Sequence, residues 1–113
     1  MKTFIRAMKA LSDPNRVKMV KMLQIKPLCV CEIKEALGIA QSTASKHLKI
    51  LEDAELVESY KDGLWVNYSL SKGDSPYASD MIENMKNWLN DETDIKELME
   101  ILPGIDRHSI VGK

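Results

Sequence analysis

The sequence predicts a mainly α-helical fold with one small β-hairpin, and three patterns lead to this class. Apolar residues recur at helical spacing over most of the chain, whereas Val66, Tyr68 and Leu70 alternate as in a strand. Asp62-Gly63 stands between two β-prone runs, which is a strong signal for a two-residue hairpin turn. Hydrophobic residues make up 44% and charged residues 29% of the 113 residues, so we expect one folded domain with a modest core.

Local signals set the limits of the predicted helices. Asp13 is a good N-cap before Pro14, which suits the first helical position. Gly38 is a natural helix C-cap, whereas Ala40 offers the following helix no side-chain cap. We expect helices over residues 4–11, 14–24, 30–37, 41–53, 75–90 and 92–102, and strands over residues 57–61 and 64–70.

The helices predicted over residues 30–37 and 41–53 are separated only by the short turn at residues 38–40. Two helices joined by a short glycine-containing turn form the helix-turn-helix pattern. The hairpin that follows directly has the position of a wing. The order of elements therefore predicts a winged helix-turn-helix.

The second of these helices has the side chains that DNA recognition requires. Its N-terminal half carries short hydrogen-bonding residues, which can reach base edges in the major groove, and basic residues follow that can hold phosphates. The wing tip, residues 61–65, could lie along the backbone or in the minor groove. The predicted DNA-binding residues are Gln41, Ser42, Thr43, Ser45, Lys46, His47, Lys49, Lys61 and Gly63.

The charge distribution is compatible with this interpretation, although the net charge is only −1. Residues 1–34 carry a net charge of +6, residues 35–73 carry −2 and residues 74–113 carry −5. An uneven chain of this kind can present a basic face to a polyanion. The N-terminus has no apolar signal segment and no apolar run is long enough to span a membrane, so we expect a cytoplasmic protein.

Cys29 and Cys31 are separated by one residue, at the start of the helix predicted over residues 30–37. Neighbours this close rarely form a disulfide, so we expect free thiols. Glu32 follows Cys29 at capping-box spacing, and the helix N-terminus stabilises thiolates, so the pair is a candidate soft-metal site. Residues two apart in a regular helix point roughly 200° from each other. Binding of one ion by both sulfurs should therefore distort the first turn, which would couple the metal to DNA affinity.

Three stretches together resemble one known family. They are ALSDPNR at residues 10–16, LCVCEI at residues 28–33 and QSTASKHLKIL at residues 41–51, and they are similar to the ArsR/SmtB family of metal-sensing repressors. The resemblance covers roughly residues 4–90. It implies a homodimeric repressor that binds an inverted repeat near its own promoter and is released by an inducer.

The resemblance also implies a set of site residues. The first and last helices would build the dimer interface, here through Phe4, Met8, Met81, Met85 and Trp88. The LCVCE segment resembles the arsenite/antimonite-responsive branch, in which As(III) or Sb(III) is the inducer and no further cofactor is required. A third cysteine often follows in that branch at the position where this chain has Lys34. Residues 1–102 would form the DNA-binding and dimerisation domain, and residues 103–113 a flexible tail.

Other functions remain open at this point. Cadmium or lead sensors share the cysteine pair but add cysteines that this chain lacks, and thiol oxidation or persulfide formation could replace metal as the signal. Residues 76–102 contain no histidine for a zinc or nickel site, and His108 stands alone. A winged helix can also bind proteins, although the basic face argues for DNA. We expect no enzyme, because the sequence has no glycine-rich phosphate loop, no Gly-x-Ser-x-Gly and no His-Glu-x-x-His motif. Cys31 and His47 could formally pair as nucleophile and base, but both belong to the DNA-binding core.

Overall fold

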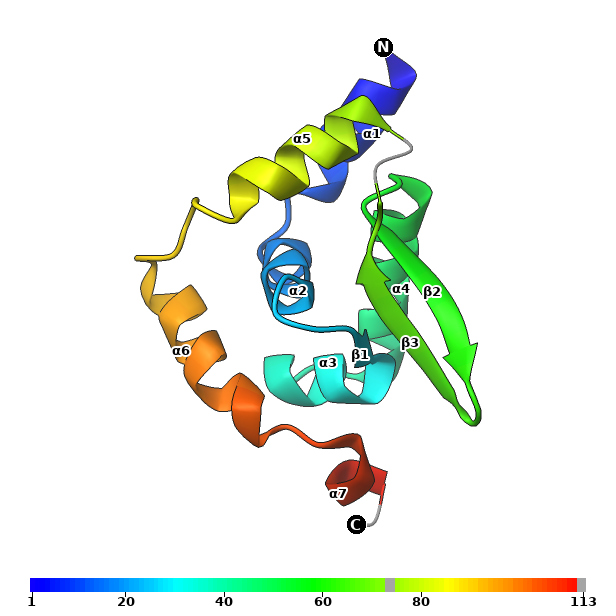
Figure 1. Ribbon diagram of the computed structural model, residues 1–113, viewed down its shortest axis with the longest axis vertical. Coiled ribbons are helices and arrows are strands. Elements are labelled where there is room, and N and C mark those ends of the chain that lie inside the picture. The colour runs from blue at the N-terminus through cyan, green and yellow to red at the C-terminus, as the bar shows by residue number, and fades with distance from the viewer. Residues whose placement is uncertain (73–74, 112–113) are drawn as a thin grey trace.

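A computed structural model describes residues 1–72 and 75–111, with side chains through residue 110. The described chain is mainly helical, with a small antiparallel sheet at one side of the helices (Figure 1). The elements in chain order are α1 (Lys2–Ala10), α2 (Pro14–Leu23), β1 (Leu28–Cys29), α3 (Val30–Leu37), α4 (Gln41–Asp53), β2 (Val57–Asp62), β3 (Trp65–Leu70), α5 (Pro76–Met85), α6 (Thr93–Ile101), the 3-10 turn η1 (Leu102–Gly104) and α7 (Arg107–Val111).

The helix limits in the N-terminal half follow the local signals. The side chain of Asp13 accepts hydrogen bonds from the amides of Asn15 and Arg16, and Pro14 is the first residue of α2. Gly38 adopts the left-handed conformation (φ 66°) and ends α3. Ala40 begins α4 without a side-chain cap, as the sequence predicts. The helix-turn-helix is therefore confirmed, with α4 as its second helix.

The hairpin is confirmed, with its turn shifted by one residue. Strands β2 and β3 pair from Val57 opposite Leu70 to Asp62 opposite Trp65. The two loop residues are therefore 63 and 64, and not Asp62-Gly63 as expected. Gly63 has a positive φ of 62° at the first central position, as in a type II′ turn.

A third strand, β1, was not expected from the sequence. Leu28 lies opposite Tyr68 and Cys29 lies opposite Asn67, so β1 adds to the free edge of β3 and the sheet order is β1-β3-β2. Both residues of β1 are buried. The sheet therefore joins the segment that precedes α3 directly to the wing.

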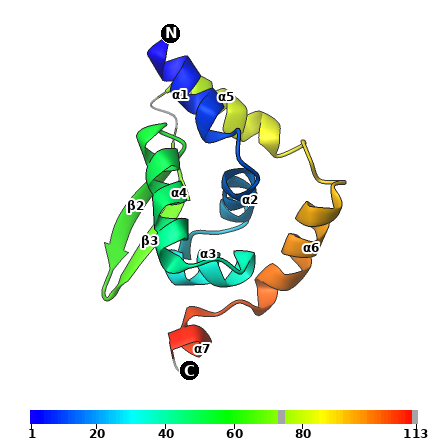
Figure 2. The ribbon, with the colours of Figure 1, turned by 180° about the vertical axis from the view of Figure 1, so that it is seen from behind.

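Helix α2 lies in the middle of the molecule, with α1 and α5 at one end and α3 at the other (Figures 1 and 2). The core around it is apolar and receives side chains from α2, α3, α4, the sheet and the C-terminal helices. Its large, completely buried residues are Met19, Val20, Met22, Leu28, Ile33, Leu48, Leu51, Leu56 and Leu102. This core fixes α3 and α4 relative to the sheet.

The C-terminal part differs most from the expectation. The helix expected over residues 75–90 ends at Met85, and Leu89 in the following turn has a positive φ of 67°. The segment expected as a flexible tail contains η1 and α7 in its described part. Among residues 1–72 and 75–111, no helix is both long and apolar enough to cross a membrane.

A buried lysine explains where α5 ends. Lys21 of α2 is only 3% exposed, and its Nζ donates hydrogen bonds to the carbonyls of Met85 (2.7 Å) and Trp88 (3.0 Å) and to Oδ1 of Asn90 (2.6 Å). Burial lowers the pKa of Lys21. The amine satisfies carbonyls that the end of a helix leaves without partners, and it holds the turn at residues 86–92 against α2.

Candidate nucleic-acid interface and cysteine pair

Helix α4 has one buried face and one face open to solvent. Ala44, Leu48 and Leu51 are buried in the core, at the three- and four-residue spacing of a helix stripe. The opposite face is polar and exposed, and it carries Gln41, Ser42, Thr43, Ser45, Lys46 and Lys49. Every residue of this set is one that the sequence predicts to contact DNA. The structure leaves their side chains accessible on one helix, around the part of it that does not face the core.

His47, which the sequence also assigns to DNA, is half-buried and has a protein partner. Its Nδ1 lies 3.1 Å from Nη1 of Arg16, and because the guanidinium has only donors, Nδ1 is the acceptor. Arg16 also donates to the carbonyls of Ala10 (2.7 Å) and Lys9 (3.3 Å). His47 thus connects α4 to the junction between α1 and α2.

Lys49 is exposed and forms an ion pair with Asp53 one turn later, at 3.0 Å. The hydrogen bond that Lys49 donates to Asp53, and the negative charge of that carboxylate, raise the pKa of Lys49. The ammonium is therefore charged, but it must leave Asp53 or share it to reach a phosphate. Lys46 has no such partner among the ion pairs of the described residues.

The wing extends from the body as two paired strands beside α4 (Figure 2). Lys61 near its tip is exposed, and Leu64 in the turn is completely exposed. Gly63 supplies the positive φ that closes the turn. The tip can therefore approach a duplex without rearrangement of the core.

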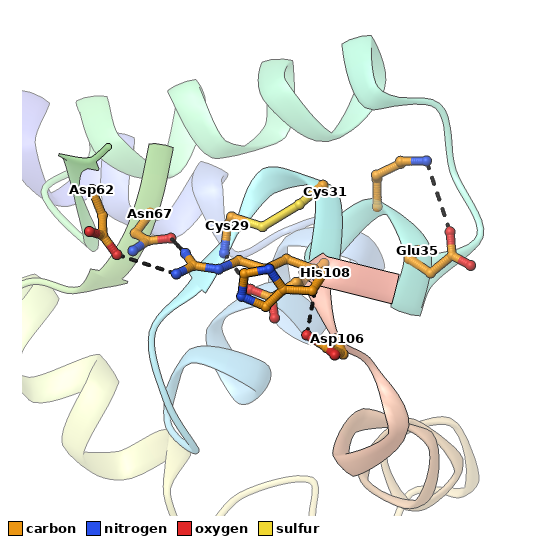
Figure 3. The surroundings of a disulfide bond; sticks show 10 residues. Cys29, Cys31, Glu35, Asp62, Asn67, Asp106 and His108 are labelled. Carbon is orange, nitrogen blue, oxygen red and sulfur yellow. Dashed lines mark hydrogen bonds and ion pairs between the residues drawn. A yellow bond between two sulfur atoms is a disulfide. The ribbon is translucent and has the colours of Figure 1, made fainter. Parts of the chain in front are cut away.

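The cysteines differ from the expectation. The sequence predicts free thiols, but Cys29 and Cys31 are joined by a disulfide, with their Cα atoms 5.4 Å apart (Figure 3). That distance is within the range of roughly 4.4–6.8 Å found in disulfides. The prediction of free thiols is therefore wrong for this structure.

The reason is the backbone at the start of α3. Cys29 is the N-cap residue with an extended backbone (φ −82°, ψ 164°), whereas Cys31 is the second residue of the helix. The angle of roughly 200° between residues two apart applies only when both residues are helical. The change of direction at the N-cap turns both sulfurs to the same side. Unwinding of the first turn is therefore not needed to bring them together.

The charged residues near the pair have partners of their own. Oε1 of Glu32 accepts a hydrogen bond from the amide of Cys29 at 2.9 Å, which is the capping-box interaction expected from the spacing. Lys34, at the position of the absent third cysteine, lies 3.9 Å from Oε2 of Glu35. Within residues 1–72 and 75–111, no group of three or more His, Cys, Asp or Glu residues could hold a metal ion.

Four of the five residues predicted at a dimer interface are accessible in the single chain. Phe4 is 42% and Trp88 47% exposed, and Met8 and Met81 are partly exposed. Met85 is only 3% exposed and packs in the core, so the expectation that it faces a partner is corrected. Helices α1 and α5 lie side by side, and Phe4 contacts Tyr77 edge-to-face with ring centroids 5.4 Å apart.

Three functional or supporting residues were missed by sequence reasoning. Lys21, Arg16 and Arg107 make their hydrogen bonds to residues that are distant in the chain or in separate elements. A charged residue within an apolar run can indicate a buried side chain with a specific partner. Lys21 stands in such a run, between Met19, Val20, Met22 and Leu23. No pattern around Arg107 indicates its contacts.

Comparisons with known proteins agree with this geometry. Residues 13–59 match the family described as "Bacterial regulatory protein, arsR family". The chain is 35% identical over 80 residues to the arsenical resistance operon repressor of Escherichia coli K12, covering 70% of this chain and 68% of that protein. It is 34% identical over 79 residues to a cadmium resistance transcriptional regulatory protein CadC homologue of Staphylococcus aureus, covering 69% of this chain and 63% of that protein.

A solved structure has the same fold. It is the homodimeric winged helix-turn-helix DNA-binding domain of a possible ArsR-family transcriptional regulator from Mycobacterium bovis, with a TM-score of 0.67 and 26% identity. The match covers 76% of this chain and 77% of that domain. The exposed polar face of α4, the wing beside it and the similarity to these regulators lead to one conclusion: this chain belongs to the ArsR family of bacterial transcriptional regulators.

Proposed function

We propose that this protein is a cytoplasmic, homodimeric repressor that binds an inverted-repeat operator and leaves it when As(III) or Sb(III) binds Cys29 and Cys31. The observation that carries the inducer assignment is the position of the two sulfurs, which meet on one side of the α3 N-terminus. Two adjacent sulfurs form the soft chelate that a thiophilic ion prefers. The similarity to arsenical resistance operon repressors supports the same choice.

DNA binding is proposed through α4 and the wing. The exposed serines, threonine and glutamine at the start of α4 would read base edges in the major groove, while Lys46 and Lys49 hold phosphates. Lys61 and Gly63 would place the wing along the backbone or in the minor groove. Two copies related by a two-fold axis would present two such helices to an inverted repeat.

The dimer is proposed to form through the α1–α5 face, which we define as Phe4, Met8, Tyr77, Met81 and Trp88. These side chains are partly or largely exposed and apolar. The first four lie on the neighbouring helices α1 and α5 at one end of the molecule, and Trp88 lies in the turn that follows α5. Exposed apolar area of this kind marks contact surfaces. The homodimeric Mycobacterium bovis domain of the same fold supports the formation of a dimer.

The inducer would react with the dithiol form of the pair. Reduction of the disulfide by two cellular thiols, which are oxidised to a disulfide of their own, supplies two electrons and two protons. Arsenous acid then exchanges two As–OH bonds for As–S bonds to Cys29 and Cys31, each thiol gives up its proton and two waters leave. The third position on arsenic would keep hydroxide or take a small cellular thiol, because Lys34 stands where a third cysteine would be.

The ion would act on DNA affinity through the elements that hold the two cysteines. An atom placed between the sulfurs separates Cys29 in β1 from Cys31 in α3. Helix α3 leads through the Gly38 turn into α4, and β1 pairs with β3 of the wing. The cysteine pair is therefore connected through α3 to α4 and through β1 to the wing. These connections would couple inducer binding to DNA affinity.

The disulfide favours a second candidate, a thiol-redox sensor on the same scaffold. Two thiols and one peroxide would give the disulfide and two waters, and the oxidised pair would be the signalling state. A cadmium or lead response is a third outcome, and the similarity to the CadC homologue supports its inclusion in the test.

The test is a release titration on thiol-reduced full-length protein. The probe is a fluorescent duplex that the wild-type chain selects from a random pool, and a scrambled duplex serves as the control. We expect specific binding that weakens steeply with salt, and release by arsenite or antimonite at concentrations where cadmium, lead and peroxide do not act. Release only by peroxide would establish the redox candidate, and equal affinity for the two duplexes would contradict the DNA-binding proposal.

A further inference from the structure

Arg107, the first residue of α7, contacts the wing from outside the winged-helix core. Its Nη2 donates to Oδ2 of Asp62 and its Nη1 to Oδ1 of Asn67, each at 3.4 Å (Figure 3). Its Cζ lies over the Trp65 ring, 4.8 Å from the centroid. Both hydrogen bonds are long, and the planar guanidinium adds a cation–π contact to them. His108 meets the same ring edge-on, with centroids 5.9 Å apart.

The contacted residues occupy the outer end of the wing. Asp62 and Trp65 are the last opposed pair of the hairpin before its turn. Arg107 therefore contacts both strands at this pair, while the turn beyond is exposed. A two-stranded ribbon that projects from a sheet gains little rigidity from its own pairing. A side chain that bridges both strands fixes its direction.

Arg107 also changes the charge that the wing presents. Asp62 is an exposed carboxylate next to Lys61, on an element proposed to approach phosphates. Without a partner, this carboxylate would repel the DNA backbone. The guanidinium lies 3.4 Å from it and offsets its charge.

The hydrogen bond from Arg107 to Asn67 connects Arg107 to the cysteine pair. Asn67 is only 8% exposed and lies opposite Cys29 in the pairing of β3 with β1. Figure 3 shows α7 beside α3, the helix that begins at the disulfide. One residue, Asn67, thus stands between the cysteine pair and the side chain that holds the wing.

We propose that Arg107 is a positioning residue that holds the wing in its DNA-binding orientation and, through Asn67, makes that orientation sensitive to the state of the Cys29–Cys31 pair. The proposal deepens the proposed function and rests on it for the role of the wing. The contacts themselves do not depend on DNA, so they can be tested separately.

The experiment measures backbone hydrogen exchange of residues 57–70 in full-length protein, together with affinity for the selected duplex. In Arg107→Gln we expect at least ~3-fold faster exchange near Asp62 and Trp65, because local opening is no longer opposed. We expect a fall of about 3- to 10-fold in duplex affinity. Lys96→Gln, which removes the same charge from an exposed position on α6, should change neither quantity.

Arg107→Lys distinguishes positioning from a direct phosphate contact. Lysine keeps the charge but lacks the planar fork, so we expect wing exchange to remain fast and affinity to remain low. A loss of affinity in Arg107→Gln with unchanged wing exchange, and a salt dependence reduced by about one phosphate contact, would show that Arg107 binds DNA directly and would overturn the proposal.

The link to the cysteines is tested by comparing the oxidised and reduced chains. In the wild type we expect reduction to change exchange at residues 65–67, and in Arg107→Gln we expect that change to be lost. An equal change in both proteins would overturn the link. If the wild type binds no duplex specifically, the proposed function fails, while the exchange data still decide whether Arg107 holds the wing.

Discussion

At the scale of single residues, existing partners decide which exposed side chains of α4 are ready for DNA. Lys49 is paired with Asp53 and His47 with Arg16, so both must exchange or share a partner on binding. Ser45 and Lys46 are exposed on the same face and have no ion-pair or side-chain hydrogen-bond partner of this kind in the described chain. Unlike Lys49 and His47, these two residues need not give up a protein partner to contact DNA.

Replacement of Ser45 or Lys46 with alanine tests their contribution to binding. Each change should weaken binding to the selected duplex by about 1–3 kcal/mol if the side chain contacts a base. If Lys46 contacts a phosphate instead, the loss should be equal on all sequences and the salt slope should fall by about 1. Fluorescence anisotropy at several salt concentrations measures both quantities. Lys96→Ala is the control, and an equal loss in that variant would show a general charge effect.

The sequence predicted the candidate DNA-binding residues, because their exposure depends only on side-chain type and helical spacing. The exposed face of α4 follows from the positions of Ala44, Leu48 and Leu51 alone. The relation between Cys29 and Cys31 was not predictable in this way. It depends on the backbone angles of the N-cap, and a periodicity argument assumes that both residues are helical.

At the scale of elements, two parts of the structure depend on distant partners. Strand β1 is only two residues long and exists because β3, about 40 residues later, offers it a free edge. Helix α5 ends at Met85 although the apolar pattern continues to Leu89, because Lys21 of α2 binds the carbonyls there. Asp13, Gly38 and Gly63 act locally, which is why the elements that they limit were predicted from the sequence.

Lys21→Met tests whether this lysine stabilises the α2–α5 contact. Methionine keeps an unbranched chain but leaves the carbonyls of Met85 and Trp88 without their donor, so unfolding should become easier by about 1–3 kcal/mol. Urea denaturation measures the change. Lys18→Met is the control, because the ammonium of Lys18 lies 3.9 Å from the exposed Asp94. This change should shift the free energy of unfolding by less than about 0.5 kcal/mol. Equal stability of Lys21→Met and the wild type would contradict the role of Lys21.

At the scale of the whole molecule, apolar side chains are exposed at the end where α1 and α5 meet. Phe4 and Tyr77 are each 42% exposed there, and Trp88 in the turn after α5 is 47% exposed. This end is separate from the cysteine pair, which lies at α3 (Figure 1). The proposed dimer interface and the proposed inducer site therefore lie on different parts of the surface.

Trp88→Glu tests the partner face. A carboxylate in an apolar contact between two copies would lose hydration without gaining a partner, so the dimer should dissociate and operator affinity should fall with it. Sedimentation velocity measures the oligomeric state, and circular dichroism checks the fold. Met85→Glu is unsuitable, because Met85 belongs to the core. Ile101→Glu, at an exposed apolar position on α6, is the matched control. A dimeric Trp88→Glu protein would place the interface elsewhere.

The central claim is that induction requires both sulfurs at the start of α3. The most direct measurement is arsenite-driven release of the selected duplex by thiol-reduced wild type and by Cys31→Ser. Serine is small and polar, so Cys31→Ser should bind the duplex like the wild type and stay bound at arsenite concentrations that release the wild type. Lys34→Cys should lower the arsenite concentration needed, because it adds a third thiolate. Release of Cys31→Ser at the wild-type arsenite concentration would contradict the account.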